Sequence, residues 1–138
     1  METKNILIYG ANGYTGKLIV AEAVARGLKP ILAGRNVETI NSMAKQFNLP
    51  ARLFDLSNQQ TINKNLKDIN LVIHCAGPFS STAEPMMQAC IESQCHYLDI
   101  TGEISVFERA FQLDKAASDA GIVLCPGAGF DVIPTDCL

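Results

Sequence analysis

The sequence predicts an α/β fold, a doubly wound parallel sheet (Rossmann fold) with helices on both faces. Two observations lead to this prediction. Strand-like and helix-like segments alternate along all 138 residues, which is the pattern of a parallel sheet. Three glycines at intervals of three also follow the first apolar run, and a tight turn from a strand into a helix needs residues without a Cβ. The turn reads Gly10-Ala11-Asn12-Gly13-Tyr14-Thr15-Gly16.

Each expected strand is short and rich in apolar residues. The six strands are expected at residues 5–9, 30–33, 51–55, 70–75, 96–100 and 122–125. The stretch 70–75 is almost wholly apolar, as a central strand buried on both faces should be. Because crossovers between parallel strands are right-handed, we expect the sheet order 3-2-1-4-5-6.

Helices are expected between these strands. They are placed at residues 14–26, 36–47, 57–66, 81–93 and 104–120. Three of them have cap signals, namely Asn36 and the capping boxes Ser57-x-x-Gln60 and Ser81-x-x-Glu84. Gly27 and Gly121 are positioned to end the first and the last helix.

The composition is that of one domain covering residues 1–138. The net charge is −3 and no basic run occurs, so neither nucleic acid nor an anionic membrane is expected as a partner. No apolar stretch approaches the roughly 20 residues of a membrane span, and the first residues do not resemble a signal peptide. The five cysteines contain no Cys-x-x-Cys motif, so we expect reduced thiols, no metal site and a cytoplasmic protein.

The glycine turn predicts a site for a dinucleotide. Its glycines let the backbone approach a pyrophosphate, and the helix that follows offers unpaired N–H groups and partial positive charge. A P-loop is the nearest rival. However, the chain reads Ala11-x₄-Gly16-Lys17-Leu18, which lacks the first glycine and the hydroxyl that would hold Mg²⁺. A purely structural glycine turn is the other alternative.

The residues after the second expected strand indicate the cofactor. About 20 residues past the glycine turn, NAD enzymes usually carry an Asp or Glu that binds the adenosine ribose, but this chain reads Ala33-Gly34-Arg35-Asn36. An arginine matches the 2′-phosphate of NADP, and no carboxylate is there to repel it. We therefore expect NADP(H) rather than NAD(H), unless Arg35 is simply a solvated residue at a helix start. S-adenosylmethionine is disfavoured because it has no phosphate for Arg35.

Two further segments are expected at the carboxyl edge of the sheet, where such ligands bind. Asp55 closes the third strand and is either a neighbour of the adenine ring or a turn residue. The loop Ala76-Gly77-Pro78 follows the fourth strand. Its small residues leave room for the nicotinamide-side ribose and the phosphates, with a simple Gly-Pro turn as the alternative.

No catalytic residue can be assigned from the sequence. Asp99 and Glu103 are the acids at the end of the fifth strand. We expect Thr101 to cap the next helix and Glu103 to complement its dipole, with direct catalysis as the alternative. His74 and His96 are expected to be packed residues. The chain has no Tyr-x-x-x-Lys pair, nucleophile elbow or zinc signature.

Five sequence blocks occur in an order that is typical of one family. They are Gly-Ala-Asn-Gly-Tyr-Thr-Gly, Leu-Ala-Gly-Arg-Asn, His-Cys-Ala-Gly-Pro-Phe, His-Tyr-Leu-Asp-Ile-Thr-Gly-Glu and Pro-Gly-Ala-Gly-Phe-Asp-Val-Ile-Pro-Thr-Asp. From Ile6 to Asp136, the chain resembles the amino-terminal domain of saccharopine dehydrogenase-like oxidoreductases, including the trans-acting enoyl reductase branch. The resemblance implies that the glycine turn holds the pyrophosphate, Arg35 the 2′-phosphate and residues 76–78 the nicotinamide half. The expected cofactor-binding residues are Gly10, Ala11, Asn12, Gly13, Tyr14, Thr15, Gly16, Arg35, Asn36, Asp55, Ala76, Gly77 and Pro78.

The resemblance also implies a second domain. Family members continue past the block Gly129-Phe130-Asp131-Val132-Ile133-Pro134 into a domain that binds substrate and usually pairs subunits, whereas this chain stops at Leu138. We expect a truncated chain, inactive alone, from a homodimeric enzyme. That enzyme would transfer hydride between nicotinamide and a small carbonyl, imine or enoyl substrate. A non-catalytic NADP(H) sensor acting through a partner is the alternative function.

Overall fold

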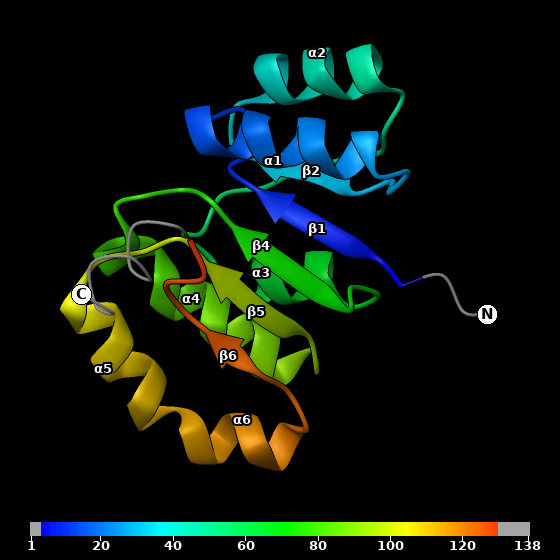
Figure 1. Cartoon of the computed structure of the whole chain (residues 1–138). Coiled ribbons are helices and arrows are strands. Elements are labelled where there is room, and N and C mark those ends of the chain that lie inside the picture. Colours follow the sequence, from blue (N-terminus) through cyan, green and yellow to red (C-terminus); the bar gives the residue numbers. More distant parts are fainter. Residues whose placement is uncertain (1–3, 130–138) are drawn as a thin grey trace.

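The computed structural model describes residues 4–129, and these form a six-stranded parallel sheet in the order β3-β2-β1-β4-β5-β6 (Figure 1). The strands are β1 (Ile6–Tyr9), β2 (Ile31–Gly34), β3 (Ala51–Leu53), β4 (Leu71–His74), β5 (His96–Asp99) and β6 (Leu124–Cys125). Every neighbouring pair is parallel. The predicted fold class and strand order are therefore confirmed.

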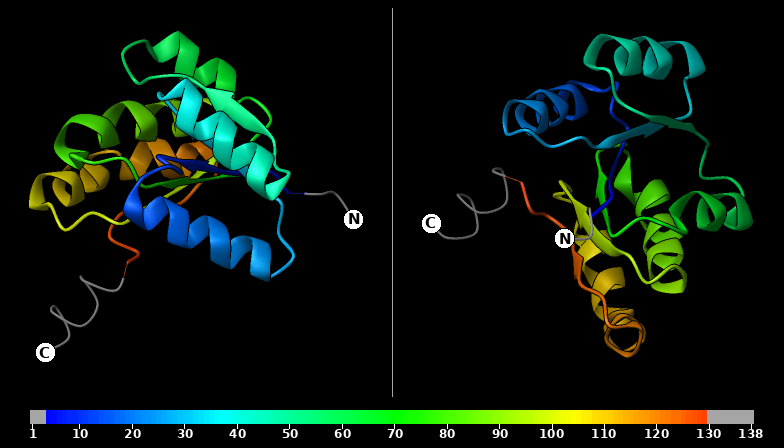
Figure 2. Two further views of the ribbon diagram at one scale, coloured as in Figure 1. Left: turned by 90° about the horizontal axis from the view of Figure 1, so that it is seen from above. Right: turned by 90° about the vertical axis from the view of Figure 1, so that its right-hand side faces the viewer.

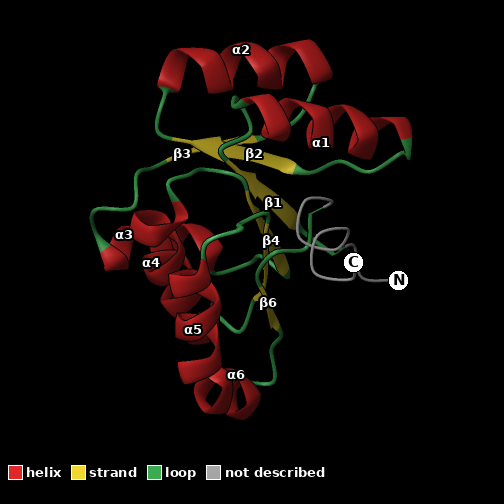
Figure 3. Cartoon of the chain, turned by 60° about the vertical axis from the view of Figure 1, so that its left-hand side comes forward, coloured by secondary structure: helices red, strands yellow, loops and turns green. Residues whose placement is uncertain are grey.

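Helices cover both faces of this sheet. They are α1 (Tyr14–Ala25), α2 (Val37–Phe47), α3 (Gln59–Leu66), α4 (Phe79–Glu92), α5 (Ile104–Gln112) and α6 (Asp114–Ala120). Figures 2 and 3 show α1 and α2 on one face and the other four helices on the opposite face. The chain changes face between β3 and β4, as right-handed crossovers require when the strand order reverses.

The core has two halves, one on each face of the sheet. Along β1, Ile8 points to the half beneath α1 and α2, together with Val20 and Ile40. Leu7 and Tyr9 point to the larger half on the other face. Because both faces are covered, successive residues of the central strands are buried, which explains their continuous apolar sequence.

Several helix boundaries follow their predicted signals. The Asn36 side chain accepts a hydrogen bond from the Thr39 N–H at the start of α2. Gly27 and Gly121 have φ values of +78° and +73° just after α1 and α6, a left-handed conformation that costs glycine little.

Other helix boundaries were predicted incorrectly. Asn58, not Ser57, caps α3 by accepting from Thr61 N. The helix α4 begins at Phe79, before the expected Ser81, so that Pro85 lies inside it. The single helix expected over 104–120 is two helices that meet at Leu113, a buried residue that packs into the core. Its N–H is shared between the carbonyls of Arg109 and Ala110, as is common at helix ends.

The described part of the chain bears on three expectations, namely no membrane span, no metal site and reduced thiols. Within residues 4–129 no helix is long and apolar enough to cross a membrane. The same residues contain no group of three or more His, Cys, Asp or Glu side chains that could hold a metal ion. The four described cysteines, Cys75, Cys90, Cys95 and Cys125, are free. Of the block that is expected to lead into a second domain, residues 130–134 lie outside the described residues.

Candidate functional site

The expected cofactor residues lie in loops at one edge of the sheet. Because all strands are parallel, their carboxyl ends meet at this edge, and β1 and β4 are neighbours there although their crossovers run to opposite sides. Ligands of doubly wound sheets bind at this switch point. The glycine turn follows β1, Arg35 follows β2, Asp55 follows β3 and residues 76–78 follow β4.

Two glycines of the turn are required by close contacts. A Cβ on Gly10, whose φ is +78°, would lie 2.9 Å from Ala76 Cβ in the loop after β4. A Cβ on Gly16 would lie 2.2 Å from the Gly10 carbonyl oxygen. A Cβ on Gly13 would have the Gly10 carbonyl oxygen as its nearest atom, at 3.4 Å, so packing does not exclude a side chain there. Gly10 and Gly16 thus bring the turn, α1 and the β4 loop together.

The N-terminus of α1 is open to an anion. Its N-cap is Gly13, which offers no side chain to the first N–H groups, and the first turn contains no acidic residue. Tyr14 is 84% exposed, whereas Ala11 and Gly16 are buried. Unpaired N–H groups and the helix dipole favour a negative ligand at such a terminus.

Arg35 lies between β2 and α2, on a loop that hydrogen bonds tie to the glycine turn before α1. The Asn12 amide donates to Thr39 Oγ1 at 3.0 Å, and the Thr39 N–H donates to Asn36 Oδ1 at 3.0 Å. These bonds link the glycine turn to the first turn of α2. Arg35 is exposed, and its guanidinium has no hydrogen-bond or salt-bridge partner among residues 4–129. It is therefore available to bind an anion.

Asp55 adopts the geometry of a turn residue. Its Oδ1 accepts from the Ser57 N–H at 2.9 Å and also from the Ser57 hydroxyl. These two bonds, with a smaller contribution from the charge of Arg35, hold the pKa of Asp55 below its ordinary value. Asp55 remains charged near Arg35, and its expected contact with an adenine ring stays a prediction.

The loop after β4 is fixed from inside α4. Thr82 Oγ1 donates to the carbonyl oxygen of Ala76 at 2.6 Å, and His74 Nε2 lies 3.0 Å from the same hydroxyl oxygen. A Cβ on Gly77 would meet nothing closer than 3.8 Å. Thr82 thus holds the Ala76 end of the loop, and space remains beside Gly77.

The acids after β5 have structural partners. Asp99 is fully buried and accepts from the Tyr97 hydroxyl at 2.5 Å, Thr101 N at 3.0 Å and Gly127 N at 2.8 Å. Glu103 accepts from backbone N–H groups of α4, a contact that was not expected. It is also the N-cap residue of α5, but its side chain makes no cap hydrogen bond to that helix. Its three hydrogen bonds give Asp99 a structural role at the end of β5.

The two histidines differ in their surroundings. His74 is fully buried, and burial lowers its pKa to about 4. Its Nδ1 has no partner among the described residues. His96 is exposed, contrary to the expectation that it would be packed, and its Nδ1 accepts from Val123 N at 3.0 Å. This contact joins the start of β5 to the approach to β6.

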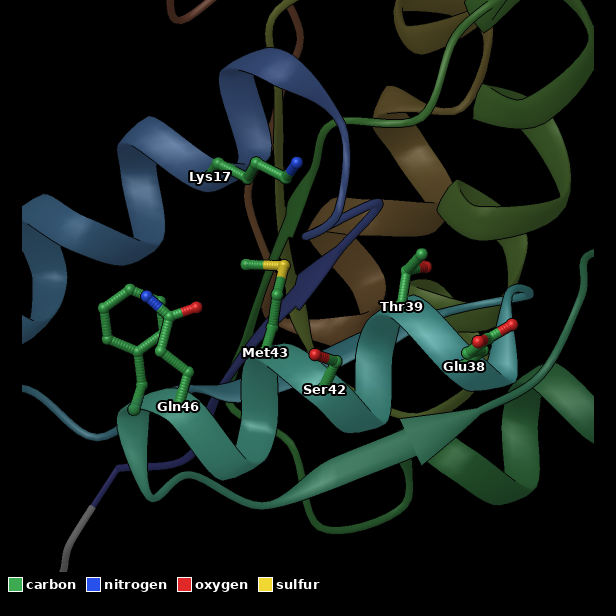
Figure 4. A pocket seen from close by; sticks show the side chains of 7 residues that line it. Lys17, Glu38, Thr39, Ser42, Met43 and Gln46 are labelled. Carbon is green, nitrogen blue, oxygen red and sulfur yellow. The ribbon is translucent and has the colours of Figure 1, made fainter.

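A cavity of about 520 Å³ lies between α1 and α2 (Figure 4). Figure 4 shows Lys17 on α1 facing Thr39, Ser42 and Met43 on α2. Sequence reasoning considered Lys17 only as a P-loop residue and did not identify Thr39, Thr82 or the contact of Glu103. No local motif marks these residues, and Thr39 and Glu103 act on segments more than 20 positions away in the sequence.

The comparison with known families agrees with this geometry. Residues 6–125 match the family described as the saccharopine dehydrogenase NADP binding domain. The chain belongs to this family. The resemblance and the cofactor expected from the sequence, NADP(H), are therefore both confirmed.

Individual relatives place this NADP-binding domain within longer proteins. A protein named as a probable mitochondrial saccharopine dehydrogenase-like oxidoreductase of Arabidopsis thaliana is 31% identical, over 96% of this chain and 33% of its own length. The trans-acting enoyl reductase of Mycobacterium bovis is 29% identical, over 96% of this chain and 34% of its own length. This chain thus spans about one third of the length of these curated relatives.

Solved structures share the fold of this NADP-binding domain. Saccharopine dehydrogenase (L-Glu forming) from Saccharomyces cerevisiae superposes with a TM-score of 0.80 at 19% identity, over 94% of this chain and 28% of the other. AtPrR2 with NADP⁺ and (+)pinoresinol superposes with a TM-score of 0.69 at 18% identity, over 94% of this chain and 51% of the other. At these identities the likeness establishes the fold alone.

The observed residues fit NADP(H). The turn is too crowded for a Cβ at Gly10 or Gly16, the N–H groups of α1 have no side-chain cap, and Arg35 is exposed with no ionic partner among residues 4–129. A pyrophosphate suits the first two features, and a 2′-phosphate suits the third. The contribution of each of the expected residues to cofactor binding remains a prediction.

Proposed function

We propose that the whole protein transfers hydride between NADP(H), held by this domain, and a small carbonyl, imine or enoyl substrate. Bound NADP(H) would supply or accept the hydride. The domain would fix one face of the nicotinamide above the crevice between β1 and β4. The name of one relative, a trans-acting enoyl reductase, supports an enoyl substrate within this range.

The observation that carries the proposal is the exposed Arg35 on a loop that hydrogen bonds tie to the glycine turn before α1. Its guanidinium has no hydrogen-bond or salt-bridge partner among residues 4–129. In this proposal the N–H groups of α1 bind the pyrophosphate, Arg35 binds the 2′-phosphate, and residues 76–78 line the nicotinamide half. The Asn12–Thr39–Asn36 hydrogen bonds support it, because they fix the loop that carries Arg35 relative to the glycine turn. Arginine is well suited to phosphate because its planar guanidinium can donate two parallel hydrogen bonds.

The groups that bind substrate and move its protons are proposed to lie on the remaining two thirds of the protein. The acids that the described residues place at the crevice already accept backbone or side-chain hydrogen bonds. In this proposal the second part also pairs two subunits. Assay of a full-length relative with imines and enoyl thioesters would test the substrate class.

The cytoplasmic location also remains a proposal, supported by the free thiols of the described cysteines. The Arabidopsis relative is named as mitochondrial. Fractionation of cells that express the tagged protein would decide the location.

Calorimetric titration with NADPH and NADH tests the role of Arg35. We expect NADPH to bind more tightly, and Arg35→Ala to lose about 1.5–3 kcal/mol of that preference, because a charge-assisted contact is removed. Arg26→Ala is the matched control, since Arg26 pairs with Glu22 at the far end of α1. Binding of NADPH with an unchanged preference in Arg35→Ala would refute the assignment of Arg35, and failure of both nucleotides to bind would refute the proposed function.

A further inference from the structure

A carboxylate from the loop between β5 and α5 closes the N-terminus of α4. Glu103 Oε1 accepts from Phe79 N at 3.0 Å, and Glu103 Oε2 accepts from Ser80 N at 2.8 Å. Both N–H groups belong to the first turn of α4. The two residues that donate are more than 20 positions away from Glu103 in the sequence.

The first turn of α4 depends on this carboxylate. Its N-cap is Pro78, whose side chain has no oxygen and makes no cap hydrogen bond. Without Glu103, the N–H groups of Phe79 and Ser80 would have no protein partner among the described residues. The negative charge at this position is also favoured by the dipole of α4. Glu103 therefore acts as a cap supplied from another loop.

Glu103 is itself held in place from β5. Its N–H donates to Thr101 Oγ1 at 3.0 Å, and the Thr101 N–H donates to Asp99 Oδ1 at 3.0 Å. Asp99 is fully buried at the end of β5. A series of short contacts thus leads from the sheet through Asp99, Thr101 and Glu103 to the start of α4.

We propose that Glu103 is a positioning residue for the nicotinamide half of the cofactor site. Ala76, Gly77 and Pro78 directly precede α4, so the position of the first turn of α4 determines the end of this loop. Thr82 holds the other end through the Ala76 carbonyl. The inference rests on the proposed function, which assigns this loop to the nicotinamide half.

Glu103 also distinguishes the two helix termini at the switch point. The start of α1 has no side-chain cap, whereas the start of α4 is occupied by the Glu103 carboxylate. An anionic group of the cofactor is therefore directed to α1, and the loop before α4 is left for the uncharged end of NADPH.

Titration with two ligands separates this role from a general loss of stability. NADPH contains both halves of the cofactor, whereas adenosine 2′,5′-bisphosphate lacks the nicotinamide half. We expect Glu103→Ala to raise the Kd of NADPH about tenfold, because the loop that lines the nicotinamide half is no longer held in place before the cofactor binds, and to leave the Kd of the bisphosphate within about twofold. Glu103→Gln keeps one acceptor oxygen and should show a smaller increase for NADPH.

Glu84→Gln is the matched control on the same helix, because Glu84 pairs with Arg109 on the surface and does not touch the loop. It should change neither affinity. An equal loss for both ligands in the two Glu103 variants, or no loss for NADPH, would overturn the inference. If Glu103→Ala does not fold, the comparison of Glu103→Gln with wild type decides. If the wild-type chain binds neither ligand, the proposed function fails and this inference fails with it, whereas wild-type binding without the difference refutes the inference alone.

Discussion

At the scale of single residues, the site depends on two glycines whose surroundings leave no room for a Cβ. Gly10 and Gly16 are required because a Cβ at either position would overlap backbone or Cβ atoms of the turn and of the β4 loop. Gly13 has more room, although the sequence motif includes all three glycines. The motif predicted the turn correctly, but only the structure shows which positions are closed by packing.

Substitution of Gly16 by alanine tests this packing. In an ordinary helix the change would stabilise the protein by about 1 kcal/mol. Here the new methyl group would lie 2.2 Å from the Gly10 carbonyl oxygen, so we expect a loss of about 3 kcal/mol or more. Urea unfolding followed by circular dichroism measures the difference.

Gly102→Ala is the control for that substitution, since a Cβ there would meet nothing within 4 Å. Its free energy of unfolding should stay within about 0.5 kcal/mol of wild type. A stable Gly16→Ala protein with unchanged NADPH affinity would show that the close contact is relieved by a small shift and that the glycine is not required.

At the scale of elements, the helices at the carboxyl edge begin in three different ways. Asn36 and Asn58 cap α2 and α3 from their own chain positions, Glu103 caps α4 from another loop, and α1 begins without a side-chain cap. The start of α5 also lacks a side-chain cap hydrogen bond, so the caps alone do not mark one anion site. The glycine turn, together with the missing cap, distinguishes α1 as the start that the motif assigns to the pyrophosphate.

The caps of these helices also explain which helix boundaries could be predicted from the sequence. The cap at Asn36 is a local signal, three residues before the N–H that it binds, and it was predicted correctly. Ser57 was expected to cap α3, but its N–H and hydroxyl donate to Asp55 two residues earlier, and Asn58 is the cap. The cap of α4 comes from Glu103, and no pattern near residue 79 could indicate it. Strand order and the edge that carries the glycine turn depend only on alternation and handedness, so they were predictable.

At the scale of the whole molecule, a buried neutral histidine links stability to pH. His74 lies in the larger half of the core among the rings of Tyr9, Phe79 and Tyr97. The pKa of Tyr9 is raised to about 12 and that of Tyr97 is also raised, both mainly by burial. Both phenols are therefore neutral below pH 7, and neither compensates a charge on His74.

The sign of the pH effect follows from the lowered pKa. Between pH 6.5 and about 4, His74 is protonated in the unfolded chain but not in the folded protein. Folding is therefore fully stabilised above pH 6.5 and loses stability as the pH falls through this window. From pH 7 to pH 4.5 we expect His74 to account for about 2–3 kcal/mol of the decrease in unfolding free energy.

Urea unfolding of wild type and His74→Leu at pH 7 and pH 4.5 measures this contribution. The variant should be less sensitive to acid than wild type by that amount. Parallel pH profiles for wild type and His74→Leu would show that His74 is not the group responsible.

We expect the carboxyl edge of the sheet to bind one extended cofactor along its whole length. The most direct measurement is a crystal structure of this chain with NADP⁺. We predict the pyrophosphate at the N–H groups that begin α1, the 2′-phosphate within hydrogen-bonding distance of Arg35, and the nicotinamide beside residues 76–78. A cofactor bound elsewhere, or bound at this edge with its 2′-phosphate away from Arg35, would contradict the account.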